Sequence, residues 1–176
     1  LTGMEFEMRD AEDKDVVYMG ITDDTGYLDM VVPPGIYNVF GIKYTLGQPS
    51  HGYMGRIDLD VAEGVEGDWN AVGAARLAGT VFYRDTDNVL HRDLTSGNKL
   101  VWTHKETRSE IEVSYIAGTY QTDLPYGTYE VGGSITTEEY GIELDYYASK
   151  TVVVNSAMDA RDLSIEFQKN RLQTFR

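Results

Sequence analysis

The sequence contains no cysteine, only four prolines, and no apolar run near the length of about 18 residues that a membrane-spanning helix needs. Without cysteine the chain can form no disulfide bond, thiolate metal site or cysteine nucleophile. Basic residues are also few, because 15 Lys and Arg side chains face 29 Asp and Glu side chains, for a net charge of −14. Such a charge repels phosphate backbones and anionic lipid surfaces. We therefore expect neither nucleic acid nor a membrane surface as a partner.

Tyrosine and glycine are abundant instead, with 13 Tyr and 18 Gly among 176 residues, a composition that suits strands and tight turns. The length leaves room for one large domain or two small ones. Acidic residues concentrate early, since residues 1–76 carry 14 acidic and 5 basic side chains. The simplest explanation of the acidic excess is a surface that keeps the protein in solution. The alternatives are binding of a divalent cation and adaptation to high salt.

Two stretches of the chain resemble each other at a constant spacing. Thr25-Gly26-Tyr27 is followed by Pro33–Val39, and 92 residues later Ala117–Tyr120 is followed by Pro125–Val131. The opening segment Leu1–Phe6 likewise matches Leu77–Phe82. An internal repeat of this kind fixes the architecture before anything else does.

Short segments of alternating polarity, separated by Gly, Pro and Asp turns, predict strands rather than helices along the whole chain. One of them is Tyr27–Val32, which we expect to return from the turn at Gly26. The predicted fold class is all-β, with two tandem antiparallel β-sandwiches of prealbumin or immunoglobulin-like type. Their predicted extents are residues 1–76 and 77–167, with an insertion near 84–110, a boundary near Arg76–Leu77, and a basic tail or linker at 168–176.

The repeated pattern reads Leu-x-Gly at the opening strand, then Gly-Tyr or Gly-x-Tyr, then Pro-x-Gly-x-Tyr-x-Val. It resembles the carboxypeptidase regulatory-like domain, one of a group that includes collagen-adhesin B-type repeats and starch-binding-like modules. The residues that carry the resemblance are Leu1, Gly3, Asp23, Gly26, Tyr27, Pro34, Gly35, Tyr37 and Val39, then Leu77, Gly79, Val81, Gly118, Tyr120, Pro125, Gly127, Tyr129 and Val131.

The resemblance implies a non-catalytic structural or interaction module, used as a spacer, stalk or assembly unit. We expect it in a prokaryotic extracellular or cell-surface protein, with other domains of that protein or copies of itself as partners. The motifs themselves are turn and core positions, and such positions say little about function.

Catalysis finds little support in the residues. The three histidines, His51, His91 and His104, lie in polar segments without a metal-ligand spacing, and no Gly-x-Ser-x-Gly elbow occurs. We therefore expect no enzyme activity and no organic cofactor.

Calcium is the one cofactor that the sequence suggests. Two acidic runs, Asp10–Asp15 and Asp85–Asn88, each follow an arginine near the start of the two matching stretches. Ca²⁺ takes six to eight oxygen ligands from loops of this kind. Neither run has the glycine and distal glutamate of an EF-hand, and hydrogen-bonded Asp and Asn turns are the competing interpretation. The candidate ligands are Asp10, Asp13 and Asp15, and Asp85, Asp87 and Asn88.

Carbohydrate binding is the alternative function, because exposed aromatic rings offer flat apolar faces to sugars. Trp102, Tyr146 and Tyr147 are the candidates, and the two adjacent tyrosines must lie on opposite strand faces. We expect Trp69 to pack in the junction between the two predicted sandwiches. The tail from Gln168 to Arg176 is basic and carries no acid, so it is a linker or a segment that docks on an acidic neighbour.

Overall fold

A computed structural model describes residues 1–60, 68–92, 94, 98–156 and 163–169. The described residues contain no helix, and hence none that is long and apolar enough to cross a membrane. The strands are β1 (Glu5–Asp10), β2 (Val17–Ile21), β3 (Gly35–Thr45), β4 (Gln48–Leu59), β5 (Val72–Arg84), β6 (Leu90–His91), β7 (Lys99–His104), β8 (Glu110–Ser114), β9 (Thr119–Pro125), β10 (Gly127–Glu139), β11 (Ile142–Val154) and β12 (Ile165–Lys169).

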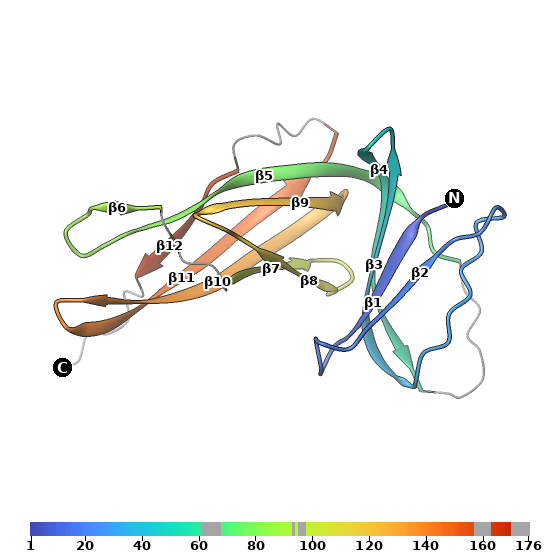
Figure 1. The fold of residues 1–176 in the computed structure, drawn as a ribbon, viewed down its shortest axis with the longest axis horizontal. Helices are drawn as coiled ribbons and strands as arrows, with labels where there is room; N and C mark the ends of the chain where they lie inside the picture. Colours follow the sequence, from blue (N-terminus) through green and yellow to red (C-terminus); the bar gives the residue numbers. More distant parts are fainter. Residues whose placement is uncertain (61–67, 93, 95–97, 157–162, 170–176) are drawn as a thin grey trace.

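The prediction of an all-β chain is confirmed. Hydrogen bonds link the strands in the order β2-β1-β3-β4-β5-β12-β11-β10-β7-β8, while β6 and β9 pair with β5. All pairs are antiparallel except β12 with β5, so the sheet is mixed. In space, β1 to β4 form one lobe and β6 to β12 the other, with β5 running along the top of the second lobe toward the first (Figure 1).

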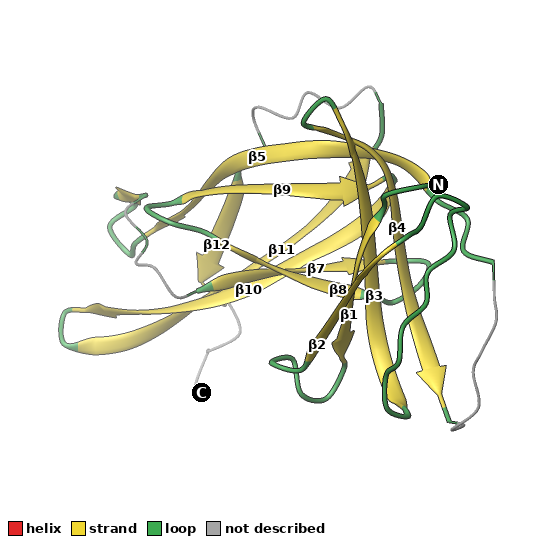
Figure 2. Cartoon of the chain, turned by 45° about the vertical axis from the view of Figure 1, so that its right-hand side comes forward, coloured by secondary structure: helices red, strands yellow, loops and turns green. Residues whose placement is uncertain are grey.

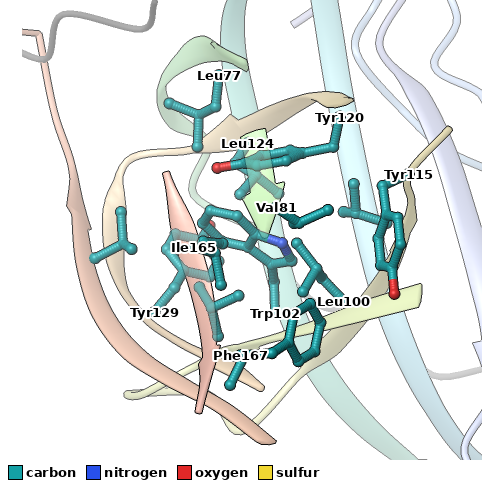
Figure 3. Packing of buried hydrophobic residues seen from close by; sticks show 14 of the residues in the cluster. Leu77, Val81, Leu100, Trp102, Tyr115, Tyr120, Leu124, Tyr129, Ile165 and Phe167 are labelled. Atoms are coloured by element: carbon teal, nitrogen blue, oxygen red, sulfur yellow. The ribbon is translucent and has the colours of Figure 1, made fainter. Parts of the chain in front are cut away.

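Two separate groups of buried side chains lie in these lobes. We call the group around Met4, Phe6, Met8, Tyr37 and Val39 the first core. The second core is larger and lies between β5, β9 and β12 on one side and β7, β10 and β11 on the other (Figure 3). Its fully buried large side chains are Leu77, Val81, Leu100, Trp102, Tyr115, Leu124, Tyr129, Tyr146, Ile165 and Phe167.

Strand β5 belongs to both lobes. Val72 and Gly73 pair with β4, whereas residues 74–80 pair with β9 and residues 81–83 pair with β12. The predicted boundary at Arg76–Leu77 therefore falls inside a continuous strand. Figure 2 shows this strand passing without a linker from the edge of β4 to the far end of the molecule.

The matching stretches of the sequence have matching local structure. Gly26 and Gly118, which lie 92 residues apart, both adopt the left-handed conformation, with φ of 84° and 71°. Tyr37 and Tyr129 are both buried, and each donates its hydroxyl hydrogen bond to the carbonyl of the residue four positions earlier, Pro33 or Pro125.

The predicted strand Tyr27–Val32 is wrong. Its side chains do alternate, because Leu28, Met30 and Val32 pack against the first core while Asp29 and Val31 are exposed. No described strand pairs with it, however, so it forms no ladder. Its counterpart in the second stretch, β9, does pair, and lies along β5.

Two other expectations about aromatic residues also fail. Tyr27 is 57% exposed rather than buried. Trp69 does not pack in the junction between lobes, because its ring stacks on Tyr53 at a centroid distance of 5.2 Å and also contacts Phe6 in the first core. Stacking within the first core gives the indole two aromatic neighbours at once, and such pairs stabilise beyond their buried area.

Candidate functional site

The predicted sugar-binding aromatics do not form a platform. Trp102 and Tyr146 are both 0% exposed, and Figure 3 shows the Trp102 ring in the middle of the second core. As binding residues these two predictions are wrong, because β7 and β11 turn both side chains toward the packed face of the sheet. Tyr147 is 48% exposed on the opposite face, as the strand alternation requires.

The six predicted calcium ligands are not brought together, and no group of three or more potential metal ligands gathers within the part of the chain that is described. Asp10 accepts hydrogen bonds from the backbone amides of Glu12 and Asp13 at 2.8 and 3.0 Å. Asp13 accepts the amide of Asp15, and Asp85 accepts the amides of Asp87 and Val89. These are Asp turns, the competing interpretation, and Asn88 sits in the second of them with φ of 64°.

Strands β5, β10 and β11 bring several polar and aromatic side chains together at the outer end of the second lobe. We call Tyr83, Asp85, His91, Glu139 and Tyr146 the tip cluster. The imidazole of His91 stacks on Tyr83 at a centroid distance of 4.6 Å and an interplanar angle of 12°. Its Nε2 lies 2.7 Å from Oδ2 of Asp85, and the Tyr146 ring lies 4.9 Å from the Tyr83 ring at an interplanar angle of 54°.

The carboxylate of Glu139 on β10 links Tyr146 of β11 to Thr86, which follows β5. Its Oε1 accepts the Tyr146 hydroxyl at 2.5 Å, and its Oε2 accepts both the amide and the hydroxyl of Thr86, at 3.0 and 2.7 Å. Burial acts to raise the pKa of Glu139, but these hydrogen bonds outweigh it and the pKa is lowered. The hydrogen bond to His91 similarly lowers the pKa of Asp85. Both carboxylates are therefore charged at neutral pH.

A pocket of about 300 Å³ opens beside the tip cluster. Among the residues that the structure describes, those lining the pocket include the basic His91 and Arg92 but no Asp or Glu, although the chain is strongly acidic. The lining also includes the aromatic ring of Tyr83, the amide of Asn98 and the hydroxyls of Thr136 and Thr137. The remaining lining residues are apolar: Leu90, Leu94 and Ile135.

Among the described residues, the tip cluster holds an acid–imidazole pair but no nucleophile beside it. Asp85 and His91 form an acid–imidazole pair, yet no hydroxyl of a described residue lies within hydrogen-bonding distance of His91. A nucleophile within hydrogen-bond reach of its base is the signature that such chemistry requires. The other histidines lie elsewhere, His51 exposed on β4 and His104 buried beside Gly127.

A second candidate site is the contact between the lobes. Arg76 donates two hydrogen bonds to Asp123, from Nε and a terminal nitrogen, at 2.8 and 2.9 Å. Tyr44 of β3 donates to the same carboxylate at 2.9 Å. Burial, together with that hydrogen bond, raises the pKa of Tyr44 to about 12. One carboxylate of β9 is thus held by both lobes.

Further contacts join β3 to β8 across the same junction. The side-chain oxygen of the buried Asn38 accepts the backbone amide of Glu110 at 3.1 Å. Lys14 lies 3.5 Å from the carboxylates of both Glu110 and Glu112. Phe40 and Met54, from the sheet of the first lobe, pack against the second core. The junction therefore combines apolar packing with hydrogen bonds that fix its orientation.

Sequence reasoning missed both sites. Asp123 and Arg76 are separated by 47 residues, and Thr86 and Glu139 by 53, with no motif to connect them. One signal was available, since the alternation along Thr119–Pro125 places Asp123 on the outward face of a predicted strand. The alternation predicts the face of the strand on which Asp123 lies, but it does not predict which residues Asp123 contacts.

Comparisons with known proteins add little to this geometry. No family model matches the chain, and no curated protein matches it. A solved structure of a "putative carbohydrate binding protein" from Pseudomonas aeruginosa superposes with a TM-score of 0.43 at 11% sequence identity, over 54% of this chain and 89% of that chain. At that TM-score the likeness carries no argument. The resemblance to the carboxypeptidase regulatory-like domain stays a prediction.

Proposed function

We propose that this chain is a non-catalytic structural module of an extracellular or cell-surface protein, which holds two β-sandwich-like units in a fixed relative orientation. The observation that carries the proposal is the junction, where β5 continues through both lobes and Asp123 accepts hydrogen bonds from Arg76 and Tyr44. A spacer must transmit position from one end to the other. A shared strand does this without a flexible linker.

The packing at the junction supports the same proposal. A Cβ placed on Gly52 of β4 would lie 2.6 Å from Cγ of Pro125, and one placed on Gly73 would lie 2.3 Å from the Tyr126 ring. Glycine at both positions lets the strands approach to a distance that any larger side chain would prevent. The lobes are therefore closely packed against each other at this point.

Spin-label distance measurements test the proposal directly. Because the chain has no cysteine, Ile21→Cys on β2 and Val153→Cys on β11 introduce two specific labelling sites, both at exposed positions. We expect a single narrow distance distribution, which broadens when Asp123→Ala removes the shared carboxylate. A broad distribution in the doubly labelled parent chain would contradict a rigid module.

The matched control is Glu130→Ala. Glu130 pairs with Lys105 at 3.0 Å within the second lobe only, and both side chains are about half exposed. This substitution also removes one acidic partner but leaves the junction intact, so the distance distribution must stay unchanged. Broadening by both substitutions would point to general loosening rather than to the junction.

Carbohydrate binding is a second candidate, and the pocket at the tip favours it. The pocket combines aromatic rings with hydrogen-bonding side chains, which is the composition that fixes a sugar. Because Arg92 is a cationic residue among the described residues that line the pocket, we propose an acidic sugar, such as a uronic acid, rather than a neutral one.

Calorimetric titration with uronic-acid oligosaccharides and with neutral oligosaccharides of equal length tests this candidate. Binding of the acidic series, lost in Arg92→Ala and kept in Tyr147→Ala, would support it. Arg92 is exposed, so its truncation leaves the fold intact, and Tyr147 lies on the outer face of β11. Binding of neither series, or loss in Tyr147→Ala alone, would reject the tip as the site.

A further inference from the structure

Among the described strands, β2 is one end of the hydrogen-bonded order, and it exposes apolar side chains. Met19 is 74% exposed and Ile21 is 61% exposed, although both lie in a regular ladder with β1. Val17 shares their face of the sheet, because successive side chains of a strand alternate. We call Val17, Met19 and Ile21 the edge strip.

The backbone of β2 directs the N–H and C=O groups of the edge strip away from β1. Asp10 donates its amide to the carbonyl of Val16, and Thr22 donates its amide to the carbonyl of Met4, at 3.0 Å in both cases. Hydrogen-bonded and non-hydrogen-bonded pairs alternate along an antiparallel ladder, so the even-numbered residues of β2 bond to β1. The odd-numbered residues, which form the edge strip, therefore present their backbone groups to the outer edge.

The two ends of the hydrogen-bonded order differ in charge. The last strand, β8, carries Glu110 and Glu112, and charged side chains are one of the devices that keep an edge strand from pairing further. The segment Val16–Thr22 contains no charged residue and no proline, and its register with β1 shows no bulge. Strand β2 thus lacks the features that would block another strand.

The edge strip also continues an interface that the molecule already uses. Met19 lies opposite Glu7 of β1, Glu7 lies opposite Phe40 of β3, and Phe40 lies opposite Met54 of β4. The four side chains share one face of the sheet, and Phe40 and Met54 pack against the second core. One end of this row is therefore covered by the second lobe, while Met19 at the other end is open.

We propose that β2 pairs antiparallel with β2 of a second copy of this chain, about a two-fold axis at Met19. In this register Met19 faces its own copy and Val17 faces Ile21, so the outward backbone groups of each pair meet and exchange hydrogen bonds. Both edge strips then lie on the same face of the joined sheet, and each shields part of the other from water. Because β2 carries no charge, no like charges face each other within the paired strands.

Charge outside the strand opposes this pairing. Each copy has a net charge of −14, and Asp15 and Asp23, which flank β2, come to the same ends of the paired strands. Salt screens repulsion of this kind. Two strands of five residues also form a smaller contact than the about 1,200–2,000 Å² of a standard stable interface. The dimer is therefore weak, and salt strengthens it.

Sedimentation equilibrium of the parent chain from about 10 μM to 1 mM, at low and at high salt, is the first part of the test. We expect a monomer–dimer equilibrium whose dissociation constant falls as salt rises. Met19→Lys and Met19→Glu should each weaken association at least about tenfold, because like charges then meet at the axis. An equimolar mixture of the two variants should associate again, because a lysine then faces a glutamate.

The matched control is Val153→Lys. Val153 is 55% exposed on β11 in the second lobe, so this substitution makes the same change of charge far from β2 in the strand order. It should associate as the parent chain does. Since Met19 is more exposed than Val153, neither substitution removes a buried side chain.

Three results would overturn the inference: a parent chain that stays monomeric at every concentration, a Met19→Lys variant that dimerises like the control, or a mixture no more associated than either variant alone. The rigidity of the junction is measured separately. Because Ile21 lies in the edge strip, the spin-labelled chain is diluted in excess unlabelled chain, so pairing between copies adds no distance between labels. A narrow distance distribution in a monomeric chain would keep the proposed function and reject the pairing of β2.

Discussion

Tyr37 and Tyr129 donate the same hydrogen bond at two places that lie 92 residues apart. Each hydroxyl reaches the carbonyl of the proline four positions earlier, at 2.8 Å in both cases. The bond closes the turn before a long strand and holds the tyrosine ring in its core. The two bonds differ in environment, because the one at Tyr129 is buried and the one at Tyr37 is partly open to water.

We predict that Tyr129→Phe lowers the free energy of unfolding by about 1–2 kcal/mol, because a buried carbonyl loses its donor. Tyr37→Phe should cost less than about 1 kcal/mol, since water can replace the hydroxyl at the more open Pro33. Urea denaturation measures both. Tyr147→Phe, an exposed tyrosine, is the control and should be neutral. A larger loss for Tyr37→Phe than for Tyr129→Phe would refute this ordering.

Alanine substitutions at Gly118 and Gly141 distinguish the cost of backbone strain from the cost of steric crowding. Their φ angles are nearly equal, 71° and 74°, but a Cβ on Gly118 would lie 1.9 Å from the carbonyl oxygen of Arg92, whereas one on Gly141 meets nothing within 4 Å. Alanine at Gly141 should cost only the left-handed penalty, about 1–2 kcal/mol. Alanine at Gly118 should cost clearly more or prevent folding. Equal losses in thermal unfolding would show that crowding plays no part.

His104 makes stability depend on pH. Burial lowers the pKa of His104 below its ordinary value of 6.5, and its Nδ1 accepts the amide of Thr107, so the folded chain holds the ring neutral. The unfolded chain takes up a proton near pH 6.5. Stability is therefore complete above that pH and falls as pH drops toward the lower folded pKa, by up to about 1.4 kcal/mol per pH unit.

Denaturation of His104→Gln at pH 7.5, 6.5 and 5.5 checks this sign. We expect the variant to be less stable than the parent at pH 7.5 but to lose less stability on acidification. His51→Gln is the matched control, because His51 is exposed on β4 and should leave the slope unchanged. A parallel loss in the parent chain and in His104→Gln would place the pH dependence elsewhere.

Glu139 should hold the tip of the second lobe together. Glu139→Gln replaces one acceptor oxygen by a donor, so either the Tyr146 hydroxyl or the Thr86 pair loses its acceptor. We predict a loss of about 1–2 kcal/mol at neutral pH. Because the folded-state pKa of Glu139 is lowered, the loss should shrink as pH falls below about 4.5. Its exposed neighbour Glu138→Gln should be near neutral, and equal effects would contradict the assigned role.

Turn residues and polar–apolar alternation in the sequence predicted those features of the fold that depend on residues close together in the chain. The left-handed turns at Gly26 and Gly118, and the burial of Tyr37, Tyr120 and Tyr129, follow from turn chemistry and strand alternation. Strand alternation also predicted that Tyr146 and Tyr147 lie on opposite faces, though not which ring would be exposed. Such signals act over a few residues, and the sequence displays them directly.

Long-range pairing could not be predicted in the same way. Tyr27–Val32 has the alternation of a strand, but whether it becomes one depends on a partner that alternation does not specify. Trp102 has the composition of a sugar platform, and only the closure of β5, β9 and β12 over β7 and β10 buries it. The tip cluster depends on the same closure, so its residues stayed unrecognised.

The parallel pairing of β12 with β5 determines when the second lobe can form during synthesis. Val81–Tyr83 must wait for Ile165–Phe167, nearly the last described residues, before β12 fills its place between β5 and β11. Of the described residues, the first core contains none beyond Ala71, so it can form on the ribosome much earlier. In between, β5 carries an open edge, which is the state in which a nascent β-protein aggregates or needs a chaperone.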